Sequence, residues 1–162
     1  RDPPDLHYRL PSFPRRRSSD LNSANQALDR IVNFFPEDRR PQLLMDLSLN
    51  LRAMVSQRLL PKQDSKGRVA AIEVMLNSPL ISDLIFKGEV TEIKEIMKKS
   101  RNLGMQTFDQ ALFDLFESNL VTYEDALRNA DSVNDLRLQI KLGSQRAKSL
   151  DLAAGTEHFA IV

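Results

Sequence analysis

Hydrophobic residues recur at helical spacing along most of the chain after residue 22. Ser23, followed three positions later by Gln26, has the spacing of a capping box and predicts a helix that Pro36 ends. Glu37 and Asp38 then mark the start of a second helix. Its apolar stripe is expected at Leu44, Leu47, Leu51, Met54 and Val55. The pattern therefore predicts two helices, of which the second is long and faces the core.

Between residues 58 and 76 the pattern becomes typical of β-strands. Residues 58–61 and 68–76 are β-compatible runs, and the polar residues 62–67 between them include turn formers. The second run is apolar on both faces apart from Glu73, so we expect both faces to be covered. Pro61 places the first run at the edge of a sheet. A β-hairpin is predicted.

The chain after the hairpin returns to helical spacing. Ser78 and Pro79 predict the start of a helix and Gly88 predicts its end, and a further helix is expected from Val90 to residues 103–104. Capping-box spacing then predicts helices near residues 108–118, 123–130 and 133–147, starting from Thr107 with Gln110, Thr122 with Asp125, and Ser132 with Asp135. Residues 148–162 are expected to form a tail. The predicted fold is mainly α with one β-hairpin, and its last helices form a compact bundle.

Composition narrows the classes of function. The sequence has 162 residues and no Cys, which excludes disulfides and thiolate metal sites. No apolar run approaches the roughly 18 to 20 residues that a membrane-spanning helix needs. Five of the 23 Lys and Arg and three of the 22 Asp and Glu lie in residues 1–21, so the remaining residues carry a formal net charge of −1. This balance argues against a nucleic-acid partner.

Residues 1–21 differ from the rest of the chain. They hold four of the eight prolines and show no amphipathic period. Residues 17–21 back-translate to DNA that resembles the end of a common sequencing adapter. We therefore interpret residues 1–21 as an artefact or a disordered segment and exclude them from the fold. The functional alternative is that residues 15–18 form a basophilic kinase site or an arm for an anionic surface.

The sequence shows little catalytic chemistry. Its two histidines, His7 and His158, lie in the atypical first segment and in the tail, so neither a histidine triad nor a histidine metal cluster can form in the core. None of the five glycines has the spacing of a phosphate-binding loop. Phe108, Phe113 and Phe116 are interpreted as core residues rather than a ligand pocket. The acidic residues that could be proposed as a carboxylate site are interpreted as solvated helix faces, namely Asp109, Asp114, Glu117, Glu124 and Asp125.

Four blocks in a fixed order carry a resemblance to a known family. They are residues 22–31 (NSANQALDRI), 35–38 (FPED), 67–73 (GRVAAIE) and 104–109 (GMQTFD). In this order and spacing they resemble the C-terminal part of the type IV pilus retraction ATPases, the PilT/PilU twitching-motility proteins of the secretion ATPase superfamily. The resemblance covers residues 22 to about 143. It implies that residues 22–77 are the end of a RecA-like α/β ATPase core and that residues 78–147 are a C-terminal helical domain.

Residues 79–89 stand where PilT proteins carry the motif AIRNLIRE. Ser82 and Phe86 replace its arginines, whereas Ile81, Leu84 and Ile85 are kept. These two replacements, together with residues 93–100 and 134–137, make the sequence resemble the PilU branch more than the PilT branch. Assembly ATPases of the superfamily usually carry a tetracysteine zinc element, and the absence of Cys gives that branch no support. The resemblance assigns a regulatory motif to Ile81, Ser82, Asp83, Leu84, Ile85, Phe86 and Lys87.

The resemblance also indicates what a full-length parent would contain. The family binds ATP and magnesium through a Walker A loop and acidic boxes that would precede residue 22, and neither is present here. No catalytic, cofactor-binding or metal-binding residue is therefore expected in this chain. The parent would be a homo-hexamer, or would assemble with a paralogous retraction ATPase, and would act on the pilus inner-membrane platform. Its location would be cytoplasmic, at the inner face of the bacterial inner membrane.

Two main hypotheses follow. The first is a truncated subunit of the retraction motor, structural and regulatory, without autonomous catalysis. The second is a free-standing helical interaction module. An enzyme that uses the acidic helix faces is a third reading, but it lacks a nucleophile or metal geometry.

Helical geometry distributes the motif over two faces. Ile81, Leu84 and Ile85 share one face, which we expect to be buried. Ser82 and Phe86 lie on a flanking face, with Asp83 and Lys87 on the outer side. Truncating Leu84 to Ala should therefore destabilise the fold, whereas changing Ser82 or Phe86 should leave folding nearly intact and impair retraction in the full-length motor. The alternative is that all of these residues only pack.

Overall fold

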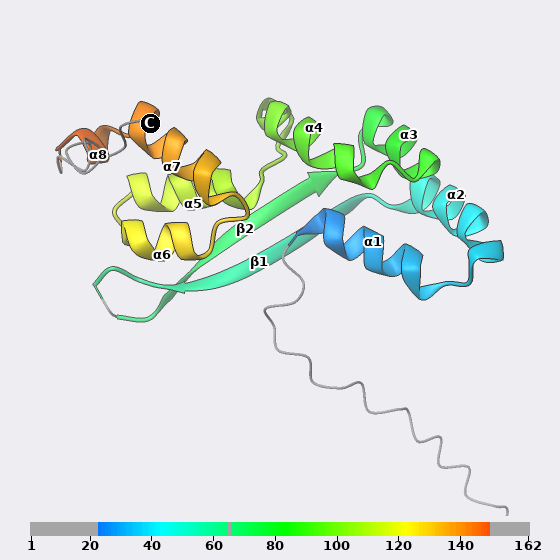
Figure 1. The fold of residues 1–162 in the computed structure, drawn as a ribbon, viewed down its shortest axis with the longest axis horizontal. Coiled ribbons are helices and arrows are strands. Elements are labelled where there is room, and N and C mark those ends of the chain that lie inside the picture. The colour runs from blue at the N-terminus through cyan, green and yellow to red at the C-terminus, as the bar shows by residue number, and fades with distance from the viewer. Residues whose placement is uncertain (1–22, 65, 150–162) are drawn as a thin grey trace, which may run out of the picture.

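The computed structural model describes residues 23–64 and 66–149 (Figure 1). The interpretation of residues 1–21 lies outside these ranges, as does the predicted tail from residue 150 onward, whereas its first two residues, 148 and 149, end a short helix. The α-helices are α1 (Ala24–Phe34), α2 (Arg40–Asn50), α3 (Pro79–Lys87), α4 (Ile93–Lys99), α5 (Phe108–Glu117), α6 (Tyr123–Arg128), α7 (Val133–Gly143) and α8 (Gln145–Ser149). Short 3-10 helices are η2 (Glu37–Arg39), η3 (Val90–Glu92) and η4 (Arg101–Leu103). The strands β1 (Ala53–Pro61) and β2 (Arg68–Leu76) pair antiparallel. The predicted mainly α fold with one hairpin is confirmed.

Side-chain caps explain where the helices start. The hydroxyls of Ser23, Ser78, Thr107, Thr122 and Ser132 each accept a hydrogen bond from the backbone N–H three positions later. These five predicted helix starts are confirmed. At the start of α5 the two bonds of a capping box are present: the Thr107 hydroxyl accepts from the N–H of Gln110, and the Gln110 side chain accepts from the N–H of Thr107.

The prediction for the second helix is wrong in its C-terminal part. Helix α2 ends at Asn50, and Met54 and Val55 lie in strand β1, which starts at Ala53 instead of residue 58. The side chain of Asn77 ends the helix by donating to the carbonyls of Ser48 (2.9 Å) and Leu51 (2.8 Å). This helix stop comes from a residue 26 positions away from Leu51, so no local pattern could predict it.

The hairpin is covered on one face only, which corrects the expectation that β2 is covered on both. Ala71, Glu73 and Met75 are buried, whereas Ile72 on the opposite face is 40% exposed. On β1 the same uncovered face carries Val55 and Leu59, which are 67% and 55% exposed. The covered face of the hairpin is therefore the one that contains Glu73.

Several predicted helices are shorter than expected. Helix α4 ends at Lys99, and the turns up to Gly104 are the 3-10 helix η4. Helix α7 ends at Gly143, and Ser144 separates it from α8, so the predicted helix over 133–147 is two helices. Both Gly88 and Gly104 have φ near +80° (75° and 89°), the left-handed conformation that glycine adopts most easily after a helix.

The buried apolar side chains form two separate cores. The first lobe, helices α1 to α4, surrounds a core that includes Leu28, Ile81, Ile85 and Met97. The second lobe, helices α5 to α8, surrounds a core with the side chains Leu60, Ala71, Phe108, Leu112, Phe116, Leu136 and Ile140. The hairpin extends from one lobe to the other, and α1 and α4 are drawn on opposite sides of its end in the first lobe (Figure 1).

Helices from both sides of the predicted domain boundary at residues 77 and 78 share the core of the first lobe: α1 precedes it, and α3 and α4 follow it. The boundary itself stays a prediction. None of the described helices is long and apolar enough to cross a membrane.

Candidate functional site

Helix α3 carries the seven motif residues on distinct faces. Ile81 and Ile85 are completely buried and Leu84 is 8% exposed, all in the core of the first lobe. The predicted burial of this face is confirmed. The assigned regulatory role stays a prediction.

The other face of α3 reaches solvent. Phe86 is 57% exposed, and Asp83 forms an exposed ion pair with Lys87 one turn later (2.6 Å). The hydrogen bond to Asp83 raises the pKa of the Lys87 ammonium. This outer surface can therefore contact a partner without disturbing the apolar face below it.

Helices α2 and α3 enclose a shallow groove of about 330 Å³ beside Phe86. Met45 and Leu49 supply its α2 side, and both are exposed. Ser82 joins the two helices, because its hydroxyl donates to the carbonyl of Ser48 (2.7 Å). The motif position Ser82 thus has a structural contact as well as a place in the groove.

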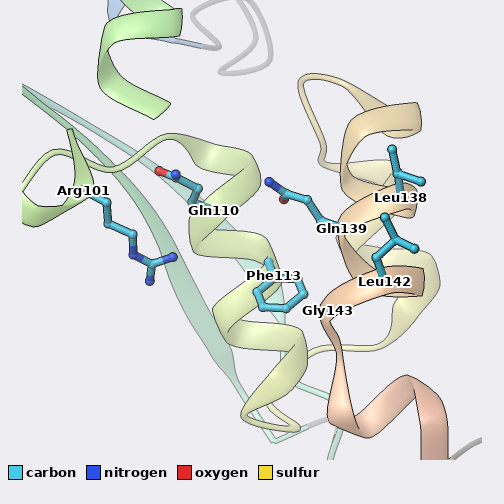
Figure 2. Close-up of a pocket in the computed structure, with 7 residues that line it drawn as sticks. All are labelled: Arg101, Gln110, Phe113, Leu138, Gln139, Leu142 and Gly143. Atoms are coloured by element: carbon cyan, nitrogen blue, oxygen red, sulfur yellow. The ribbon is translucent and has the colours of Figure 1, made fainter. Parts of the chain in front are cut away.

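A second pocket, of about 460 Å³, lies between α5 and α7 (Figure 2). Phe113 extends from α5 toward Leu142 on α7, and Gln110 and Gln139 approach from the same two helices. Phe108 and Phe116 are fully buried, which confirms them as core residues, whereas Phe113 is only partly buried and lines this pocket. The pocket is mostly apolar and carries no cluster of groups that would perform chemistry.

Two carboxylates, those of Glu73 and Asp109, are buried, and neither was proposed as a site from the sequence. Asp109 is 2% exposed, so its interpretation as a solvated face is wrong. Its two oxygens accept from the backbone N–H groups of Asp131 (2.8 Å) and Ser132 (3.3 Å). Glu73 is 1% exposed and accepts from the N–H of Ala24 at the start of α1 (2.6 Å). Burial raises the pKa of both carboxyl groups.

A junction of opposite charges lies beside these carboxylates. Asp131 binds the Arg58 guanidinium (2.6 Å) and the Lys94 ammonium (2.8 Å), and its side chain is 10% exposed. Arg58 also stacks on the Phe108 ring, with the guanidinium carbon 4.0 Å from the ring centre. Glu73 was the one signal in the sequence, because it is the single charged residue between Val69 and Leu76 of β2.

The described residues do not fit a nucleotide site. Gly67, Gly88 and Gly104 lie in the hairpin turn and at helix ends, not in a loop that could surround a triphosphate. Among residues 23–64 and 66–149, no group of three or more His, Cys, Asp or Glu could hold a metal ion.

Solved structures share this fold. The crystal structure of the pilus retraction motor PilT with bound ADP matches 72% of this chain and 32% of its own, with a TM-score of 0.64 and 32% identity. The ATPase DotB of Legionella pneumophila matches 65% of this chain and 28% of its own, with a TM-score of 0.53 and 20% identity, a likeness of fold alone. The fold is therefore that of the C-terminal region of pilus retraction ATPases. No protein-family model matches the chain.

Sequence relatives make the family specific. The type IV pilus ATPase PilU of Pseudomonas aeruginosa is 64% identical over 124 residues, which are 76% of this chain and 32% of PilU. PilT of the same organism is 35% identical over 108 residues, which are 67% of this chain and 31% of PilT. The chain belongs to the PilT/PilU family of pilus ATPases, and its higher identity to PilU confirms the predicted branch. It spans about a third of the length of these relatives.

Proposed function

We propose that this chain is the C-terminal part of a subunit of a hexameric type IV pilus retraction motor, structural and regulatory and without catalysis of its own. The observation that carries the proposal is the 64% identity to PilU over 124 residues. The full-length parent would bind ATP and magnesium through residues that precede this segment. One relative, PilT, has a structure with bound ADP.

The uncovered face of the hairpin supports the proposal that this chain is part of a longer subunit. Val55 and Leu59 on β1 are 67% and 55% exposed, and Ile72 on β2 is 40% exposed. Apolar side chains gathered on one face of a sheet favour another layer of structure on that face. In a longer subunit, the rest of the ATPase core would supply this layer.

The parent would assemble as a homo-hexamer or with a paralogous retraction ATPase. It would act on the pilus platform at the inner face of the bacterial inner membrane. Within it, the outer face of α3 would pass movement to a neighbour, with Phe86 as the exposed contact. The buried residues Ile81, Leu84 and Ile85 would hold that face in place.

A chimera tests this function. The matching segment of Pseudomonas aeruginosa PilU is replaced by residues 23–147 of this chain, and twitching is measured in a strain that lacks PilU. We expect the chimera to restore the activity of PilU itself, because 64% of the aligned residues are identical. A chimera that accumulates as a folded protein but restores nothing contradicts the assignment and favours the free-standing interaction module.

The same chimera tests the motif. Phe86→Ala should lower retraction while the melting temperature changes little, since most of the side chain is already in solvent. Glu124→Ala on α6, also exposed, is the matched control and should leave retraction unchanged. Normal retraction in a stable Phe86→Ala chimera would show that the motif residues only pack.

A further inference from the structure

The boundary between the two lobes is lined by charges of opposite sign. In three ion pairs that cross it within residues 23–64 and 66–149, the cation comes from the first lobe or from η4 directly after it, and the anion comes from the second lobe. These pairs, which we call the ionic seam, are Lys94 with Asp131, Lys98 with Asp135, and Arg101 with Asp114. Lys94 and Lys98 are one turn apart on α4, so a single face of that helix presents them.

A polar contact of another kind also crosses this boundary. The side-chain amide of Gln110 on α5 donates to the carbonyl of Lys98 at 3.0 Å. Each apolar core is confined to its own lobe, and the hairpin shows why. Along its covered face, Met54 and Met75 belong to the first lobe and Leu60 to the second, with the polar pair of Ser56 and Glu73 between them.

The backbone connections between the lobes are narrow. The two-stranded hairpin runs from one lobe to the other (Figure 1), and a short link joins η4 to α5. That link contains Gly104, with φ of 89°, and Gln106, which exchanges two backbone hydrogen bonds with Val74 (2.8 and 2.9 Å). A twisted ribbon and a glycine link can bend without disturbing either core.

We propose that the two lobes move against each other about the hairpin and that the ionic seam holds them closed. Interfaces between rigid bodies that move are typically polar, whereas a permanent interface buries apolar side chains. Two of the three pairs are partly exposed to solvent: side-chain exposure is 30% and 54% for Lys98 and Asp135, and 50% and 41% for Arg101 and Asp114. Pairs in this setting are weak and screened by salt, so the seam can open reversibly. The proposal does not depend on a role in pilus retraction.

Distance measurements between spin labels test the hinge directly on the full chain. The sequence has no Cys, so Asp29→Cys on α1 and Glu124→Cys on α6 place one label on each lobe at exposed positions. The seam is opened by Asp114→Lys together with Asp135→Lys. Adding Lys98→Asp and Arg101→Asp to that variant restores opposite charges across the boundary. Lys99→Asp, an exposed neighbour on α4 outside the seam, is the matched control.

The chain that carries only the two labels should give one narrow distance distribution at low salt. The Asp114→Lys, Asp135→Lys variant should shift it to longer distances and broaden it, as should about 1 M salt. The four-residue variant should return it to the narrow form, and Lys99→Asp should not move it. An unchanged distribution in the folded two-residue variant would overturn the proposal. Loss of helical circular dichroism in that variant would also overturn it, because the lobes would then be one cooperative core.

Discussion

Leu84→Ala is the substitution for which the structure gives the most definite expectation. Leu84 is 8% exposed and packs in the core of the first lobe with Ile81 and Ile85 as helical neighbours. Removing the Cγ methine and both methyl groups from such a site leaves a cavity that its surroundings fill only in part, and it costs about 2 to 5 kcal/mol. For a chain of this length, each kcal/mol lowers the melting temperature by about 3 °C. We therefore expect a decrease of about 10 °C.

Phe86→Ala on the same helix provides the comparison. The side chain is 57% exposed, so a little under half of a phenylalanine's burial free energy is at stake, or about 1 kcal/mol. The expected decrease in melting temperature is about 3 °C. Both variants keep the Ser78 cap and the Gly88 end of α3, so the difference between them reports only on which face each residue occupies.

Thermal unfolding followed by circular dichroism measures both variants on the same chain. The reasoning requires Leu84→Ala to cost clearly more than Phe86→Ala. Equal decreases would refute the assignment of a buried and an exposed face to α3. A larger decrease for Phe86→Ala would mean that the groove side of α3 is covered by something that the exposed fractions do not show.

Three further outcomes are expected from single substitutions. Thr107→Ala removes one partner of the α5 capping box and should cost about 1 kcal/mol in chemical denaturation. Gly88→Ala forces a residue with a Cβ to adopt φ of 75° and should cost about 1 to 2 kcal/mol in the same assay. Glu73→Gln should flatten the pH dependence of stability above pH 4.5. Burial raises the pKa of Glu73 above its ordinary value of 4.5, so the folded state holds the proton more tightly, and the stability of the parent chain falls as pH rises from 4.5 through the raised pKa. Denaturation midpoints measured from pH 4 to pH 8 check this, and an equally steep decrease in the Gln variant would contradict it.

Helix starts could be predicted from the sequence because capping is local. Ser78 and Thr107 each bind a backbone N–H three positions later, and that spacing is visible in the sequence. The glycines after α3 and η4 were equally informative, since a left-handed residue at a helix end strongly favours glycine. The burial of Ile81 and Ile85 on α3 could be predicted from the helical spacing of the apolar residues alone.

The transition from α2 to β1 could not be predicted in this way. Leu51 and Met54 continue a helical stripe in the sequence, yet the helix stops because Asn77 occupies its terminal carbonyls from beyond the hairpin. The prediction that both faces of β2 are covered failed for a related reason. A run of apolar residues looks the same whether its second face meets this chain or the rest of a longer protein.

Charge is where local pattern is least informative, because a charged helix face has the same spacing whether it meets solvent or a partner. Lys94 and Lys98 lie one turn apart, as solvated lysines commonly do, and their partners Asp131 and Asp135 are 37 residues further along the chain. The exposed fraction separates the two cases: the side chain of Asp131 is 10% exposed, and that of Asp135 is 54% exposed. The inner end of the seam is thus largely shielded from water and salt, whereas the outer end is accessible to both. That gradient implies that the lobes part from the outer pairs first, with Asp131 as the last contact to break.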